Sequence, residues 1–188
     1  MARKKNSTTE WAEVKAILDA NEEAESESIA SAKSKEAPSA PDLKGFASRE
    51  WLTDLLTPDK YISHRFFGGT VHQEGDMYRR FLKRKVTKYD EEEKEMLDLV
   101  VLALSAEANL PSQAEKDKAD AEKIKRGIDH LIEDIACIDC HAFQEPDPDV
   151  DGPDLTGYGS RQWIIDFVKN PEHEIFYPEN NDRMPAFG

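Results

Sequence analysis

Cysteine is scarce in this chain of 188 residues, which contains two. Two cysteines exclude the framework of several disulfides that stabilises many small secreted domains. Long hydrophobic runs are also missing, since no stretch approaches the roughly 20 apolar residues of a membrane-spanning helix. The basic start, "MARKKNSTTE", is not followed by the apolar segment of a signal peptide. We therefore expect membrane association only through a partner or through a segment outside this chain.

Positive charge is in deficit, because 25 Lys and Arg face 39 Asp and Glu, for a net charge of −14. This balance argues against nucleic-acid binding, which needs cations that face phosphates. It suits a carrier that meets protein partners through complementary charge. The charge is uneven: residues 137–188 carry eleven acidic and three basic residues, whereas "RRFLKRKVTK" at 79–88 carries six bases and no acid.

The alternating pattern of a β-strand is not evident either, and the hydrophobic periodicity is that of helices. Helices are predicted over 10–20, 90–106, 112–136 and 160–169. Asp90 with Glu93, and Ser112 with Glu115, have the spacing of capping boxes, and Ser160 is a candidate N-cap. We expect an all-α fold with long loops.

An internal repeat divides the chain. "PDLKGFASREW" at 41–51 and "PDLTGYGSRQW" at 153–163 are identical at seven of eleven positions. Both continue into a short apolar segment, a proline and aromatic residues, so we expect two tandem helical units. The expected organisation is a tail and short helix at 1–20, a linker at 21–40, a first copy at 41–110 and a second copy at 111–188. The first copy has no cysteine.

Both cysteines lie in "CIDCH", formed by Cys137, Cys140 and His141 with two residues between the thiols. Four interpretations compete: coincidence, a redox dithiol, part of a zinc site, and attachment of a covalent haem. A redox dithiol normally follows a strand, and a structural zinc site needs a fourth ligand. The spacing fits the two vinyl groups of haem c, with an iron-ligating imidazole directly after the second thiol. The motif therefore favours one covalently attached haem c.

Residues 137–188 resemble a class I (mitochondrial-type) cytochrome c domain in three motifs: CIDCH, "GPDLTG" at 152–157 and "DRMPAFG" at 182–188. The resemblance implies that the carbonyl of Pro153 orients the imidazole of His141. It also implies that Met184, 43 residues after His141, is the second axial ligand of the iron. It further implies an electron carrier rather than an enzyme, with tandem cytochrome c-like units of which only the second bears haem.

Three further residues of the second copy are candidates for contacts with the haem edge or its propionates: Tyr158, Arg161 and Trp163. Ordinary packing and surface exposure are the alternative for all three. The segment 157–188 also resembles, more narrowly, cytochrome c domains of bacterial bc-type quinol:cytochrome c oxidoreductase complexes. This resemblance implies a respiratory-chain component with redox protein partners. Because haem c is attached outside the cytosol, the periplasm or the outer face of a membrane is the expected location.

The first copy lacks the residues that attach haem, because Glu25, Ser28 and Ile29 stand where the second copy has Cys137, Cys140 and His141. We expect it to be a degenerate cytochrome c-like unit that docks the second copy or a partner. Its Met77 is expected to be a packed methionine, although His64 or His72 could serve with it in a non-covalent haem site.

In the family, a helix follows the methionine loop and crosses the N-terminal helix, but the second copy has no such segment before Gly188. Either the chain is truncated or the helix over 90–106 serves both copies, and we expect truncation. The alternative function is a zinc- or thiol-dependent scaffold or interaction protein.

Overall fold

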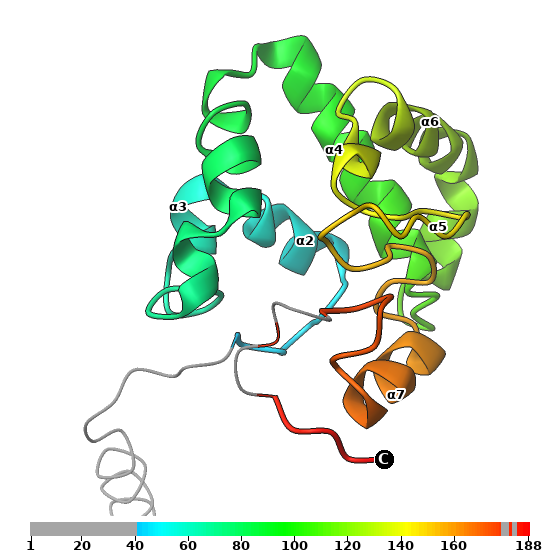
Figure 1. Cartoon of the computed structure of the whole chain (residues 1–188). Coiled ribbons are helices and arrows are strands. Elements are labelled where there is room, and N and C mark those ends of the chain that lie inside the picture. Colours follow the sequence, from blue (N-terminus) through cyan, green and yellow to red (C-terminus); the bar gives the residue numbers. More distant parts are fainter. Residues whose placement is uncertain (1–40, 178–180, 182–183) are drawn as a thin grey trace, which may run out of the picture. The chain divides into compact units, whose positions relative to one another are not determined.

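Helices of unequal length, joined by long loops, make up the fold (Figure 1). The computed structural model describes residues 41–177, 181 and 184–188, so the expected helix over 10–20 and the linker lie outside the described residues. The helices are α2 (Arg49–Leu55), α3 (Pro58–Tyr61), η1 (Val71–Glu74), η2 (Met77–Leu82), η3 (Val86–Lys88), α4 (Glu91–Glu107), α5 (Ala114–Ala119), α6 (Ala121–Ile132), η4 (Cys137–Asp139) and α7 (Arg161–Lys169). These ranges contain no strand, so the all-α class is confirmed for them. Within them, no helix has the length and apolarity needed to cross a membrane.

Polar N-caps start α4 and α7 as the sequence predicts. The Asp90 carboxylate accepts from the Glu93 N–H at 2.9 Å, and the Glu93 carboxylate accepts from the Asp90 N–H at 2.9 Å. These bonds satisfy two of the donors that a helix start leaves without partners. Ser160 accepts from the Trp163 N–H at 3.2 Å in the same way. Both predicted helix starts are confirmed.

The predicted single helix over 112–136 is wrong, because this segment forms two helices. The break is at Asp120, whose φ of −96° and ψ of 13° are not helical. Its carboxylate accepts hydrogen bonds from Arg49 of α2 at 2.7 Å and from Lys123 at 3.0 Å. The helix over 121–132 then ends before the cysteines, which lie in a separate short turn. The non-local ion pair with Arg49 therefore accompanies a bend that the hydrophobic pattern does not contain.

The capping box predicted at Ser112 and Glu115 is also wrong. The N-cap of α5 is Gln113, and its side chain makes no capping bond. The Gln113 amide instead donates to the Ser105 hydroxyl at 2.8 Å, and Ser105 donates to the carbonyl of Ala47 at 2.9 Å. Both Gln113 and Ser105 are buried, so their polar atoms need these partners.

The repeat in the sequence is also a repeat in the structure. The indole N–H of Trp51 donates to the carbonyl of Asp42 at 2.9 Å, and that of Trp163 donates to the carbonyl of Asp154 at 3.1 Å. Each indole also meets a phenylalanine ring edge-on, with centroids 5.3 Å apart in the first copy and 5.1 Å apart in the second. The two copies therefore build the same local unit around their tryptophan.

Equivalent residues of the two copies contact each other. The rings of Phe46 and Tyr158, which match in the repeat, have centroids 5.5 Å apart. A Cβ built on Gly159 would lie 2.2 Å from the Cβ of Ala47, its counterpart. A contact between matching residues is what a local two-fold axis produces. Gly159 is required here, because the two backbones approach too closely for a second methyl group.

Helix α4 belongs to the first copy in sequence, but its most extensive contact is with α6 of the second copy. Gly127 of α6 lies at this contact, where a Cβ would come within 2.1 Å of the carbonyl oxygen of Leu99. Side chains of α4, including Val100 and Leu104, share one hydrophobic core with Leu131 and with residues of both copies. Helix α4 therefore serves both copies, and all the described residues belong to one compact unit. The expected truncation stays a prediction.

Candidate functional site

A tight turn carries the CIDCH motif. The backbone enters it at Ala136 in the left-handed conformation, with φ 55° and ψ 52°. Residues Cys137–Asp139 then form one short turn of helix, in which the N–H groups of Cys140 and His141 both donate to the carbonyl of Cys137. The distances are 3.2 Å and 3.1 Å. These bonds fold the three chemically active side chains into a single turn.

The two thiols differ in their surroundings. Cys137 is partly buried, Cys140 is exposed, and neither forms a disulfide. Burial raises the pKa of the Cys137 thiol to about 12, and the nearby Cys140 adds to the effect. The thiol of Cys137 is therefore protonated at neutral pH. A redox dithiol needs the opposite shift, because its reactive form is a thiolate with a lowered pKa.

The imidazole of His141 is held by one hydrogen bond. Its Nδ1–H donates to the carbonyl of Pro153, with 2.8 Å between the two heavy atoms. Burial lowers the pKa of His141, and the hydrogen bond to Pro153 acts in the opposite direction. The ring is therefore neutral at pH 7 with its proton on Nδ1, since the carbonyl can only accept. Nε2 has no hydrogen-bond partner among the described residues, and its lone pair is available to a metal.

Gly152 lets the chain pass directly over the histidine ring. Its N–H donates to the carbonyl of Cys140 at 2.8 Å. A Cβ at Gly152 would lie 2.5 Å from that carbonyl oxygen and 2.6 Å from Cε1 and Nδ1 of His141. Any side chain would therefore push the imidazole out of place. Gly152 is not among the site residues predicted from the sequence, although the motif "GPDLTG" begins with it.

Met184 is partly buried and is held by Asn181. The Met184 N–H donates to the Asn181 side-chain oxygen at 3.1 Å, and the Asn181 amide donates to the Met184 carbonyl at 2.9 Å. The same amide also donates to the carboxylate of Glu172 at 3.2 Å. Asn181 thus fixes the backbone beside the methionine to the segment that follows α7. Asn181 is not among the site residues predicted from the sequence, and the adjacent 182–183 lie outside the described residues.

Two of the three further candidates pack between the copies. The ring of Tyr158 lies against Phe46 and also against Trp163, with a centroid distance of 5.0 Å to the indole. Burial raises the pKa of Tyr158, so its hydroxyl stays neutral. Arg161 is exposed at the start of α7. The structure thus brings Tyr158 and Trp163 together in an aromatic cluster with Phe46, and any contact of the three candidates with haem stays a prediction.

The thiols and the imidazole do not form a metal cluster by themselves. Among residues 41–177, 181 and 184–188, no three or more His, Cys, Asp or Glu side chains come together in a group that could hold a metal ion. Cys137, Cys140 and His141 all lie in these ranges, so they do not converge as a zinc site requires. A neutral imidazole beside two free thiols is a donor set suited to a covalently attached, iron-centred group.

No protein-family model, curated protein or solved structure matches this chain.

Proposed function

We propose that the chain is a c-type cytochrome that carries one covalent haem c on its second copy and transfers single electrons. The observation that carries the proposal is the hydrogen bond of 2.8 Å between Nδ1 of His141 and the carbonyl of Pro153, one turn from Cys137 and Cys140. This bond fixes the tautomer and the orientation of the ring, and it makes Nε2 a stronger donor to iron. Gly152 supports the same reading, because its missing side chain leaves room for the imidazole in this orientation.

The two thiols would anchor the haem. Each thiol would add across a vinyl double bond, so that a sulfur–carbon bond would replace the vinyl π bond and the thiol hydrogen would go to the terminal vinyl carbon. Electrons and atoms balance without an external oxidant or reductant. The lack of a disulfide leaves both sulfurs available.

His141 would supply the proximal nitrogen to the iron, and Met184 the distal sulfur. When bound, the haem supplies an iron that cycles between Fe(II) and Fe(III). A thioether is a soft ligand that favours the ferrous state and raises the reduction potential. Asn181 would position Met184 through hydrogen bonds to both the backbone N–H and the backbone carbonyl of the methionine.

The proposed setting is a respiratory chain, in the periplasm or on the outer face of a membrane. The protein would be an electron carrier rather than an enzyme, and a bc-type quinol oxidoreductase complex is the proposed partner. Its net charge of −14 suits weak docking through charged surfaces, as redox encounters require. The respiratory setting and the bc-type partner rest on the resemblance of the second copy to cytochrome c domains.

The proposal is tested by producing the chain, behind an export signal, in a host that attaches haem c. We expect a pyridine haemochrome spectrum of the c type and one haem per chain. The double variant Cys137→Ser/Cys140→Ser serves as the matched control and should yield protein without covalent haem. A wild-type chain that folds but carries stoichiometric zinc and no haem would refute the proposal.

The distal ligand is tested separately with Met184→Ala. We expect covalent haem in unchanged amount, because the thioether anchors are intact, together with loss of the weak red-edge absorption band of methionine-ligated ferric haem. The reduction potential should fall, because the soft sulfur no longer stabilises the ferrous state. Met77→Ala in the first copy is the control and should leave both properties unchanged. A red-edge band that survives Met184→Ala would contradict the distal assignment.

A further inference from the structure

A basic surface covers the segment from η2 to η3 of the first copy. It consists of the six cations of residues 79–88, all of them exposed: Arg79, Arg80, Lys83, Arg84, Lys85 and Lys88. No acidic residue interrupts this run, although the chain as a whole has a net charge of −14. The basic surface therefore reverses the charge of the molecule locally.

Most of the basic surface has no anionic partner. Its one salt bridge within residues 41–177, 181 and 184–188 joins Arg80 to Asp76 at 3.2 Å, and both side chains are more than half exposed. Lys83 lies over the ring of Tyr78, 5.9 Å from the centroid. The other four cations make no salt bridge and no side-chain hydrogen bond with any described residue. Because exposed ion pairs contribute little stability, all six cations are available to an anionic partner.

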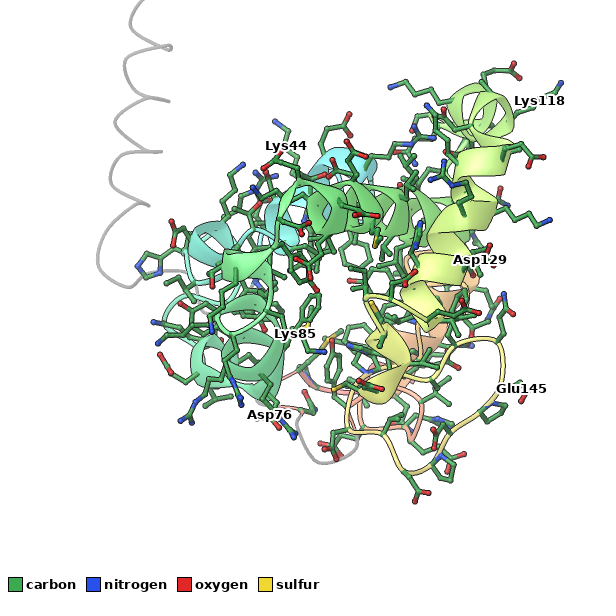
Figure 2. All side chains as sticks on the ribbon, turned by 90° about the horizontal axis from the view of Figure 1, so that it is seen from above. Lys44, Asp76, Lys85, Lys118, Asp129 and Glu145 are labelled. Atoms are coloured by element: carbon green, nitrogen blue, oxygen red, sulfur yellow. The ribbon has the colours of Figure 1, made fainter. Side chains whose placement is uncertain are left out.

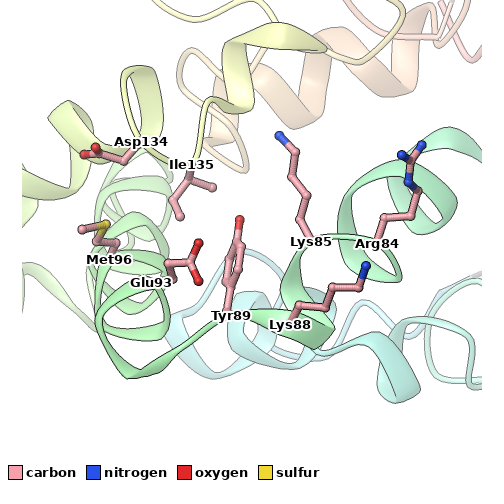
Figure 3. A pocket seen from close by; sticks show the side chains of 8 residues that line it. All are labelled: Arg84, Lys85, Lys88, Tyr89, Glu93, Met96, Asp134 and Ile135. Carbon is pink, nitrogen blue, oxygen red and sulfur yellow. The ribbon is translucent and has the colours of Figure 1, made fainter.

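The basic surface is hollowed rather than flat. Figure 3 shows three of its cations along one side of a cavity of about 500 Å³: Arg84, Lys85 and Lys88. The two acids of the cavity are already engaged, since Glu93 accepts from the Asp90 N–H at 2.9 Å and Asp134 lies 2.6 Å from Nδ1 of His130. The cavity therefore gives an incoming acidic segment both room and unpaired cations.

An acidic segment that complements this surface is present on the same chain, in the loop at 145–151 that follows the CIDCH turn. Four exposed acids alternate along this acidic loop: Glu145, Asp147, Asp149 and Asp151. None of them makes a salt bridge in the part of the chain that the structure describes. Pro146 and Pro148 fix φ between the acids, which reduces the conformational entropy that the loop loses on binding.

The basic surface and the acidic loop do not pair within one molecule. No salt bridge or hydrogen bond of the described residues joins 79–88 to 145–151. Figure 2 shows Lys85 and Glu145 well apart. At about 0.1 M salt, charges separated by more than roughly 10 Å are largely screened. The two surfaces of different molecules can therefore meet at contact range despite the net charge of −14 on each.

We propose that the basic surface of one molecule binds the acidic loop of a second copy of this chain. Two different surfaces meet in this contact, so each association leaves one basic surface and one acidic loop free, and the assembly grows head to tail. The inference goes beyond the proposed function and does not depend on it. It gives the first copy, which has no residues to attach haem, a role in association.

The test is analytical ultracentrifugation of the full chain at about 0.1 M salt. We expect the average mass of wild type to rise with protein concentration and to return to that of the monomer at about 0.5 M salt, where the ion pairs are screened. Two variants each lack one surface: Arg84→Gln/Lys85→Gln/Lys88→Gln and Glu145→Gln/Asp147→Asn/Asp149→Asn. In each variant alone, the Kd of self-association should rise at least about tenfold.

An equimolar mixture of the two variants identifies the contact directly. One variant keeps the acidic loop and the other keeps the basic surface, so one complementary pair remains. We expect a complex of one molecule of each and nothing larger. The matched control neutralises three exposed cations of α5 and α6, Lys116→Gln/Lys118→Gln/Lys125→Gln, and should associate as wild type does. Figure 2 shows Lys118 at a different end of the molecule from Lys85.

Several outcomes would overturn the inference. Wild type that stays monomeric at about 1 mM, where even a millimolar contact is populated, would leave the basic surface to a different anionic partner. Association that either triple variant leaves unchanged, or that the control weakens equally, would refute the pairing. If a triple variant does not fold, Lys85→Gln or Asp149→Asn replaces it: a smaller rise in Kd supports the inference and no rise refutes it. A c-type haemochrome spectrum with a monomeric wild type would refute this inference alone, whereas association without haem would refute the proposed function alone.

Discussion

Replacing Gly127 by alanine tests the contact between α4 and α6. The added Cβ would lie 2.1 Å from the carbonyl oxygen of Leu99 and 3.1 Å from the Cβ of Ala103. Non-bonded heavy atoms prefer about 3.5 Å or more, so the helices would have to separate by roughly 1 Å. Overpacking of this kind costs about 1–3 kcal/mol, whereas alanine is favoured over glycine in a helix by about 1 kcal/mol. We expect a net fall of about 1–2 kcal/mol in the free energy of unfolding, because the obstructing atom is backbone and cannot rotate away.

The assay is urea unfolding of the full chain, followed by circular dichroism. Gly75→Ala is the matched control, because its nearest contact is 3.2 Å and its φ is not positive, and it should change the free energy by no more than about 0.5 kcal/mol. Adding Ala103→Gly to Gly127→Ala should not restore stability, since the Leu99 carbonyl remains in the way. If Gly127→Ala were more stable than wild type, the higher helix propensity of alanine would be acting without any steric clash with Leu99. That result would refute the packing of α4 on α6.

Three further predictions concern the site and its frame. Gly152→Ala should lower the yield of covalent haem per chain, because a methyl group would displace the histidine ring beneath it; an unchanged yield would remove this residue from the site. Asn181→Ala should leave haem attachment intact but weaken the red-edge band of Met184, as the two bonds to its backbone are lost, and an unaltered band would contradict a positioning role. The hydrogen bond from Arg49, helped by Lys123, holds the pKa of Asp120 below its usual 3.8. The ion pair therefore stabilises the fold above pH 3.8, and this stabilisation is lost as the pH falls through the lowered pKa of Asp120. The free energy of unfolding of Arg49→Gln should depend less on pH in acid than that of wild type. An identical acid profile in the two proteins would disprove the contribution of the Arg49–Asp120 pair.

Local features of the fold could be predicted from the sequence because their causes are local. The capping box at Asp90 and Glu93 involves residues three apart, and the cap at Ser160 likewise joins neighbours in the chain. The sequence repeat is also present in the structure, since the indoles of Trp51 and Trp163 make equivalent hydrogen bonds. Sequence patterns of this range are read directly from one stretch of chain.

The features that the sequence did not reveal depend on residues far apart in the chain. The bend at Asp120 accompanies an ion pair with Arg49, 71 positions earlier. The packing of α4 against α6 of the second copy depends on Gly127. From the sequence alone, a glycine at this position indicates only a weaker helix. At the site, Gly152 and Asn181 act through the space or the bonds they give to His141 and Met184. Such roles could be found from sequence only by asking which backbone positions near a ligand have no room for a side chain.

The packing of α4 suggests a structural reason for the first copy, which has no residues that could attach the proposed haem. With 38% hydrophobic residues, the chain has few side chains from which to build two separate cores. The buried residues instead form one cluster, in which Leu52 and Val100 of the first copy join Leu131 and Leu155 of the second. Removing the first copy would therefore expose the core beneath the CIDCH turn, and the turn that orients the proposed haem ligands would lose its support. On the function proposed above, the two copies act as a single unit in which the second copy would hold the haem and the first completes the hydrophobic core.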